Sequence, residues 1–471
     1  MQLALPNDVL LLIGEQLELK TDRWNLILVS HLFHDLFLSL VYQKVSIHGW
    51  QDANSFLHAI LKRPALARAV RELDTTDWHA KELSDDDCNE ISQSECLTGW
   101  LHAVTHSKLE SDQWAQDLRQ GLADAWVALI LPLLSQLRKF DLVYGTRAPC
   151  LDRVMQRAVK CEKPFTVQPA FRHLVEVALH HRDDLDHSDH REDTQDGISP
   201  SSTLLLPFFQ LPSVRALTAN SVLDPSSVTA TPSEEQMEDE KSSLSFSSIT
   251  DIDLRASSGN HGMEALVSSC ADLKSFKYQH SDSHVLSHGY QPSAFYRSLT
   301  HSKKSLQTLW LDHYGSHHHF TAAGLNQSYD EWFGSLADFT ALRELRVRLP
   351  NLLNIQYQSE PTTPLIECLP SSIETLYIEG CEERYLGMLV AQLQTIIKSR
   401  RTRFARLKHI DIEGAFQNVN PDDDNPVPSS GSQNLEAAIK EKVYQAAEPL
   451  HIDCVHAGLE LYLHDRALSQ S

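Results

Sequence analysis

Clusters of histidine and aspartate are the residues of this chain best suited to chemistry. Among its 25 histidines, two runs stand out: His317-His318-His319, and a stretch from Asp183 to His190 that combines carboxylates with imidazoles. Both side-chain types bind zinc, but neighbouring residues on a strand point to opposite faces, whereas a zinc site needs ligands that converge. We therefore expect no metal site and interpret both runs as solvated loops.

Catalytic sequence motifs give no stronger signal. The chain contains no HExxH pattern, no GxSxG nucleophile elbow and no glycine-rich phosphate loop. We therefore expect no catalytic residue and no cofactor. An enzyme or metal-binding protein stays open as an alternative, because Ser, His and Asp residues distant in sequence can still meet in a folded cleft.

Overall composition argues against nucleic acid and membrane partners. The chain has 41 Lys and Arg against 63 Asp and Glu, a formal net charge of -22, so its field repels phosphate backbones and anionic lipids. The apolar amino terminus lacks a basic segment and is interrupted by Asp8 and Glu15, unlike a signal peptide. The longest apolar stretch, Trp126 to Leu134, is too short to span a bilayer, and the 8 cysteines include no CxxC pair. These features predict a soluble protein of the cytosol or nucleus.

The first 45 or so residues carry apolar side chains at helical spacing. Pro6 suits the first turn of a helix, and Thr21-Asp22 predicts the N-cap of a second one. A module this small cannot cover so many apolar residues alone, so it needs a partner or the following domain. Apolar positions follow at three- and four-residue intervals: Val9, Ile13 and Leu17, then Leu26, Val29, Phe33, Leu36 and Leu40.

These residues together resemble an F-box, over about a tenth of the chain. The resemblance implies a helical module that docks onto the Skp-type adaptor of a cullin-RING ubiquitin ligase, and through it onto a cullin. An ordinary amphipathic helical hairpin packed on its own domain is the alternative. The pattern consists of Leu5-Pro6, Val9, Ile13, Leu17, Asp22, Leu26, Val29-Ser30, Phe33 and Leu40 to Tyr42. The implied adaptor contacts are Leu5, Pro6, Val9, Ile13, Leu17, Leu26, Val29 and Phe33.

A second pattern, roughly LxxLxL, returns along the rest of the chain. From Leu273 onward its starts lie 33, 36, 31 and 34 residues apart. The last two apolar positions alternate with period two, as in a strand with one buried face, and several units follow a helix-like segment. The units start at Leu137, Leu174, Val214, Ile249, Leu273, Leu306, Leu342, Ile373 and Leu407.

Stacked helix and strand units of this kind resemble a leucine-rich repeat. The predicted fold class is α/β: a small helical F-box module followed by an irregular leucine-rich-repeat-like α/β solenoid with a parallel sheet. A generic α/β domain with helices outside a parallel sheet is the alternative. The predicted domains are 1–48 (F-box module), 49–120 (helical or acidic linker) and 121–466 (repeats), with disordered inserts near 183–197, 224–243 and 418–433.

Alternation along the predicted strands directs one set of side chains out of the sheet. Trp310, Arg346, Arg348 and Tyr377 belong to this set and stand on neighbouring strands. Large aromatics and arginines dominate the energy of protein interfaces, so these four residues form the predicted substrate-binding patch. A register shifted by one residue would turn them inward instead.

The combined patterns predict a substrate-recognition adaptor of an SCF-type cullin-RING E3 ubiquitin ligase, a non-catalytic subunit. The F-box would dock on the ligase while the repeats hold an unidentified protein substrate, raising its effective concentration near the ubiquitin carrier. An F-box scaffold that binds the adaptor without promoting degradation is the alternative.

Overall fold

The computed structural model falls into two compact units, residues 1–220 with 245–249, and residues 221–244 with 250–471. Both His and Asp runs lie outside the described residues, as do the expected inserts apart from Asp224, Ser432 and Gln433. The last two residues are helical, because they begin a helix that runs to Ala457. The described residues are 5–17, 19–79, 94–143, 148–165, 170–180, 202–224, 247–281, 290–314, 330–355, 360–415 and 432–465.

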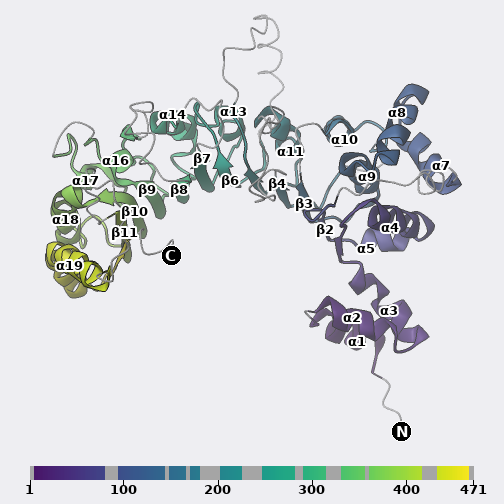
Figure 1. The fold of residues 1–471 in the computed structure, drawn as a ribbon, viewed down its shortest axis with the longest axis horizontal. Helices are drawn as coiled ribbons and strands as arrows, with labels where there is room; N and C mark the ends of the chain where they lie inside the picture. The colour runs from purple at the N-terminus through teal and green to yellow at the C-terminus, as the bar shows by residue number, and fades with distance from the viewer. Residues whose placement is uncertain are drawn as a thin grey trace, which may run out of the picture. The chain divides into compact units, whose positions relative to one another are not determined.

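Unit 1 begins with three short helices, α1 (Asn7–Glu15), α2 (Lys20–Ile27) and α3 (His31–Val41) (Figure 1). The predicted N-cap at Thr21 is wrong, because α2 already starts at Lys20 after the extended residue Leu19. Arg23 in the first turn of α2 donates from Nε to the carbonyl oxygen of Leu17, 2.9 Å away. This bond holds the start of α2 against the end of α1 without a side-chain cap.

A parallel sheet follows in unit 1, with its strands paired in chain order. Val45, Leu73, Phe140, Val177 and Leu217 form one cross-strand row that faces the core. The strands are β1 (Lys44–Ser46), β2 (Glu72–Asp74), β3 (Lys139–Val143), β4 (Glu176–His180) and β5 (Ala216–Asn220). The helices between them are α4 (Trp50–Lys62), α5 (Pro64–Ala69), α7 (Glu95–Val104), α8 (Lys108–Arg119), α9 (Ala123–Ile130), α10 (Pro149–Lys160) and α11 (Leu206–Phe209).

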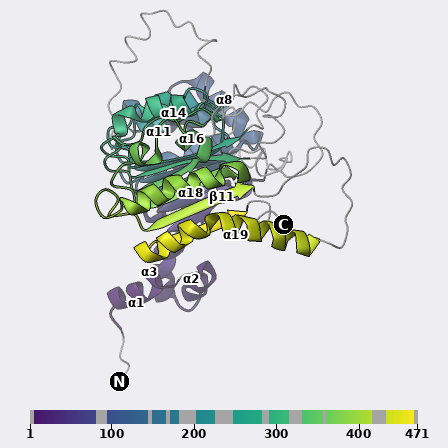
Figure 2. The same ribbon diagram turned by 90° about the vertical axis from the view of Figure 1, so that its left-hand side faces the viewer.

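Unit 2 repeats the same arrangement with longer strands. Figure 2 shows α18 and α19 side by side next to β11. The parallel strands, also in chain order, are β6 (Asp251–Ser257), β7 (Ser275–Ser281), β8 (Thr308–Tyr314), β9 (Glu344–Arg348), β10 (Thr375–Glu382), β11 (His409–Ala415) and β12 (Glu460–Asp465). The helices are α13 (Glu264–Val267), α14 (Pro292–Ser298), α16 (Leu349–Leu352), α17 (Leu365–Cys368), α18 (Glu383–Lys398) and α19 (Ser432–Ala457).

The LxxLxL units account for the core. In the LxxLxL repeat that starts at Leu273, the side chains of Leu273, Phe276 and Tyr278 are all at most 1% exposed. The later LxxLxL repeats bury the same three positions. The predicted α/β solenoid with a parallel sheet is confirmed within each unit, and all nine predicted strands are present as β3 to β11.

Three further strands lie where the spacing predicted none. β1 and β2 fall in the ranges assigned to the F-box module and the linker, upstream of residue 121, and β12 follows α19. β1 and β2 have three residues each, so each points a single side chain, Val45 or Leu73, toward the core. One inward residue cannot display the period-two alternation that reveals a strand in sequence.

Candidate protein-interaction surfaces

The three amino-terminal helices pack around a small core of Ile27, Phe37, Leu40 and Val41. Gly14 brings α1 close to α3, because a Cβ atom at this position would lie only 2.7 Å from the Phe37 ring. This core uses one side of each helix. The remaining apolar residues of the module are therefore left on its outside.

The outer surface of the module is rich in exposed apolar side chains. Leu28 is 78% exposed, Val29 65% and Leu19 64%. Soluble domains rarely gather such residues on one small surface unless it binds something. Nine of the sixteen exposed large hydrophobic residues in the described part of the chain lie here: Leu5, Val9, Leu12, Ile13, Leu19, Trp24, Leu28, Val29 and Leu32.

The predicted adaptor contacts divide into two groups. Leu17, Leu26 and Phe33 are half-buried. Leu26 and Phe33 pack against the module core, so these two residues stabilise the module as well as lining its surface. The spacing missed five exposed residues, although the unbroken apolar run Leu10 to Ile13 already signalled more apolar surface than one helix face can bury. The exposed predicted contacts are Leu5, Pro6, Val9, Ile13 and Val29. The missed residues are Leu12, Leu19, Trp24, Leu28 and Leu32.

A second candidate surface is the polar face of the sheet in unit 2. Leu309 and Leu311 of β8 are at most 1% exposed, whereas Trp310 between them is half-buried on the opposite face. The alternation therefore has the register that the spacing predicts. One cross-strand row on this face consists of Asp253, Lys277, Trp310, Arg346, Tyr377, Asp411 and Tyr462, from β6 to β12. We call it the aromatic row.

Cations and aromatic rings contact one another along the aromatic row. Lys277 Nζ lies 3.8 Å from the centre of the Trp310 ring. The guanidinium carbon of Arg346 lies 5.8 Å from the Trp310 ring and 4.5 Å from the Tyr377 ring. Such contacts contribute about 0.5–1 kcal/mol each at exposed sites. Arg346 also forms an ion pair with Glu379, so its charge is held in place on the face.

Arg348 differs from the other three predicted patch residues. Its side chain is 10% exposed and forms an ion pair with Asp330 at 3.2 Å. The adjacent strand bulges at Gly380, where φ is +63° and an added Cβ would lie 3.4 Å from Arg348 Nε. The structure thus brings Trp310, Arg346 and Tyr377 together and directs Arg348 into a buried ion pair.

Tyr377 is tied to the next strand by its hydroxyl. The hydroxyl donates to Glu413 Oε2 at 2.5 Å. Burial first, and then the neighbouring Glu413 carboxylate, raise the pKa of Tyr377, so the phenol stays neutral. The ring is therefore a fixed, uncharged binding surface.

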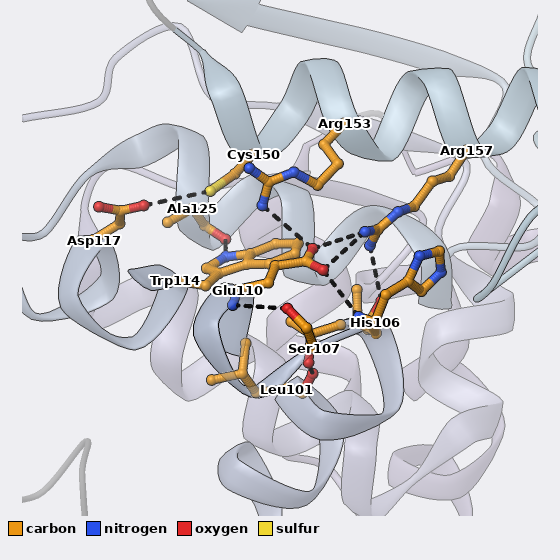
Figure 3. Close-up of polar contacts among 12 residues, drawn as sticks. Leu101, His106, Ser107, Glu110, Trp114, Asp117, Ala125, Cys150, Arg153 and Arg157 are labelled. Carbon is orange, nitrogen blue, oxygen red and sulfur yellow. Dashed lines mark hydrogen bonds and ion pairs between the residues drawn. The ribbon is translucent and has the colours of Figure 1, made fainter. Parts of the chain in front are cut away.

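Ionisable groups also gather in unit 1, among the inserted helices α7 to α10 (Figure 3). Arg157 donates from Nη2 to both Glu110 carboxylate oxygens at 2.8 and 2.9 Å, and from Nη1 to the Val104 carbonyl oxygen at 3.0 Å. Arg153 Nη1 adds a contact of 3.2 Å to the same carboxylate. Burial raises the pKa of Glu110, but the bonds from Arg157 and the His106 amide outweigh it, and the net shift is downward.

Asp124 and Cys150 lie beside this ion pair. The Asp124 carboxylate accepts the backbone N–H groups of Cys150 and Leu151, both at 2.8 Å, and so caps the start of α10. Burial raises the pKa of the Cys150 thiol, which lies 3.6 Å from Asp117 Oδ2. A protonated thiol is a poor nucleophile. These contacts join helices and offer no support for the enzymatic alternative.

Within the described ranges, no group of three or more His, Cys, Asp or Glu side chains is arranged to hold a metal ion. No helix in the part of the chain that the structure describes is long and apolar enough to cross a membrane.

Comparison with known proteins identifies the repeat region. A model of the leucine-rich repeat domain matches residues 51–423, most of the chain. The chain belongs to the leucine-rich repeat domain family. A search of curated proteins found no match. Leucine-rich repeat domains are typically interaction modules without catalytic activity, which indicates protein partners in general. The match starts in α4, so the helices α1 to α3 precede it.

Proposed function

We propose that this leucine-rich repeat protein is the substrate-recognition adaptor of an SCF-type cullin-RING ubiquitin ligase. The observation that carries the proposal is the apolar outer surface of α1 to α3, a helical module with F-box spacing directly before the repeats. Its own core uses only part of its apolar side chains. Covering the exposed ones with a Skp-type adaptor would remove this surface from water, at about 25 cal/mol for each Å² of apolar area buried.

The repeats would supply the other half of the function. The aromatic row presents Trp310, Arg346 and Tyr377 on a rigid sheet, and these residue types dominate interface energies. This chain would hold a substrate at the aromatic row and the ligase at α1 to α3. The lysines of the substrate would then meet the charged ubiquitin carrier at high effective concentration, without any reacting side chain from this protein.

The docking half is tested with substitutions that leave the module core intact. Leu12 and Leu28 are 59% and 78% exposed, so Leu12→Glu/Leu28→Glu leaves the fold unchanged while placing two charges in the contact. We expect capture of a purified Skp-type adaptor with its cullin to fall at least a hundredfold, since an unpaired buried charge costs several kcal/mol. Leu109→Glu is the matched control, because Leu109 on α8 is 82% exposed outside the module.

Three results decide between the possibilities. Loss of adaptor and cullin in the Leu12→Glu/Leu28→Glu protein, with Leu109→Glu unchanged, supports the adaptor role. Unchanged capture in both proteins, or no capture by the wild type, refutes it. Capture of the Skp-type adaptor by the wild type without cullin would instead favour the F-box scaffold that does not promote degradation. Trp310→Ala/Tyr377→Ala should keep the adaptor and lose the protein substrate.

A further inference from the structure

The aromatic row has three large rings, and two of them are already paired with cations of the same chain. Trp310 has Lys277 at 3.8 Å, and Tyr377 has Arg346 at 4.5 Å. Tyr462 is the third ring, 46% exposed at the β12 end of the row. Neither β11 (HIDIEGA) nor β12 (ELYLHD) contains a Lys or Arg that could lie over it.

Tyr462 is surrounded by imidazoles and carboxylates. His409 stacks on the Tyr462 ring with centroids 4.9 Å apart, and His464 lies parallel to it at 6.4 Å. Asp411, which pairs with Tyr462 in the strand register, is only 7% exposed and lies near both imidazoles, with its Oδ2 4.0 Å from His409 Nε2. His464 Nε2 is 3.3 Å from Asp411 Oδ1, and His409 Nδ1 is 3.2 Å from Glu460 Oε2. The three rings thus form a stacked platform whose two imidazoles contact the buried Asp411 carboxylate.

The charge of this end of the face is negative. Asp411, Glu413 and Glu460 all point out of the same side of β11 and β12, and the Glu460 side chain is 70% exposed. The row from β7 to β9 carries Lys277 and Arg346 instead. Carboxylates beside an exposed aromatic ring are the surroundings that Lys and Arg side chains prefer, since the ring face and the carboxylates both attract positive charge.

We propose that the β11 and β12 end of the sheet face binds an extended protein segment rich in Arg and Lys. A basic side chain beside the exposed Tyr462 ring, within reach of the exposed Glu460 carboxylate, would extend the pairing of cations with rings that Trp310 and Tyr377 already show. This inference rests on the proposed function and gives the substrate its class: a protein recognised through a basic stretch. Burial raises the pKa of Asp411, and a nearby cation would favour its ionised form.

Other partners fit this surface less well. A nucleic acid would bring phosphates against three carboxylates, and the chain as a whole carries a net charge of -22. An acidic segment meets the same repulsion. A basic segment gains from both the local carboxylates and the overall field, which also speeds its encounter with the face.

The test uses the full chain and two labelled ten-residue peptides, one of alternating Arg and Gly and one of alternating Glu and Gly. Binding is measured by fluorescence anisotropy at low and at physiological salt. Glu413→Gln/Glu460→Gln keeps the side-chain shapes and removes two charges, and Tyr462→Ala removes the ring. Glu367→Gln/Glu383→Gln changes the net charge equally, but at exposed positions on α17 and α18. Circular dichroism and thermal melting confirm that each variant is folded.

We expect the wild type to bind the Arg peptide and not the Glu peptide. Glu413→Gln/Glu460→Gln should weaken binding about tenfold and make it less sensitive to salt, and Tyr462→Ala should weaken it about threefold to fivefold. Glu367→Gln/Glu383→Gln should stay within about twofold of wild type. Equal loss in both charge variants, or no loss in either, would overturn the proposal.

The same proteins separate this inference from the ligase role. All three variants should capture the Skp-type adaptor like the wild type, because β11 and β12 belong to unit 2 and the docking module to unit 1. Peptide binding without any adaptor capture would refute the proposed function alone. Adaptor capture with no preference for the Arg peptide would refute the basic-segment proposal alone.

Discussion

Removing the Glu110 carboxylate tests how α8, which lies between β2 and β3, is held against α10, which lies between β3 and β4. In Glu110→Ala, the Arg157 guanidinium loses both bonds from its Nη2 while staying in a site where its side chain is only 8% exposed. It keeps the single bond to the Val104 carbonyl oxygen. The variant also deprives the His106 amide of its acceptor, Glu110 Oε2 at 2.9 Å.

The expected loss follows from these contacts. Leaving one charge of a buried pair without its partner costs about 3–5 kcal/mol, and loss of the bond to the His106 amide adds about 1 kcal/mol. The Glu110 side chain is 11% exposed, so some water reaches it and the lower part of this range applies. We expect Glu110→Ala to destabilise unit 1 by about 4–5 kcal/mol. Glu110→Gln keeps its acceptor oxygen and should cost about half as much.

Hydrogen exchange followed by mass spectrometry measures this loss locally, because the two units need not unfold together. Protection factors of peptides from α8 and α10 give the free energy of opening. Glu382→Ala is the control, since the Glu382 and Arg384 side chains are 52% and 67% exposed, and such pairs contribute less than about 1 kcal/mol. A loss below about 1 kcal/mol in Glu110→Ala would refute the reasoning.

The pH dependence of Glu110 extends this test. Because the folded-state pKa of Glu110 is lowered, its contribution is present above the unfolded-state pKa and is lost as the pH falls through the folded-state value. The stability difference between wild type and Glu110→Gln should therefore be full at pH 7 and shrink below about pH 4. A difference that stays constant down to pH 3 would contradict the ion pair.

Two further predictions concern Asp124 and Gly14. Burial raises the pKa of Asp124 from 3.8 to about 6, so the folded state binds an extra proton between these values, and the free energy of unfolding should fall by up to about 3 kcal/mol as the pH rises from 4 to 6. Asp124→Asn should abolish this slope in urea titrations at several pH values; an unchanged slope would assign it to another group. Gly14→Ala places a Cβ 2.7 Å from the Phe37 ring and 2.8 Å from Leu40, and should destabilise α1 by about 1–3 kcal/mol by hydrogen exchange. Gly99→Ala, with open space around its added Cβ, should be neutral or slightly stabilising, and equal effects of the two changes would refute the packing argument.

The sequence alone determined the strands of the repeats and the faces of their side chains. Alternation in a strand is a local property, so LxxLxL placed Leu309 and Leu311 inward and Trp310 outward before any tertiary contact was known. Repetition along the chain then implied that the strands lie parallel and in order. The same spacing predicted the helices of the amino-terminal module.

Only the tertiary structure decided how side chains meet across strands. The bulge at Gly380 and the position of Asp330 drew Arg348 into a buried ion pair, and both depend on chain segments distant from Arg348 in sequence. The chain also gave no sign that Leu28 stays exposed while Phe37 is buried, because helical spacing marks apolar positions without saying which of them the module's own core will cover. The Tyr462 platform was invisible for the same reason: its members come from two strands that only the register brings together.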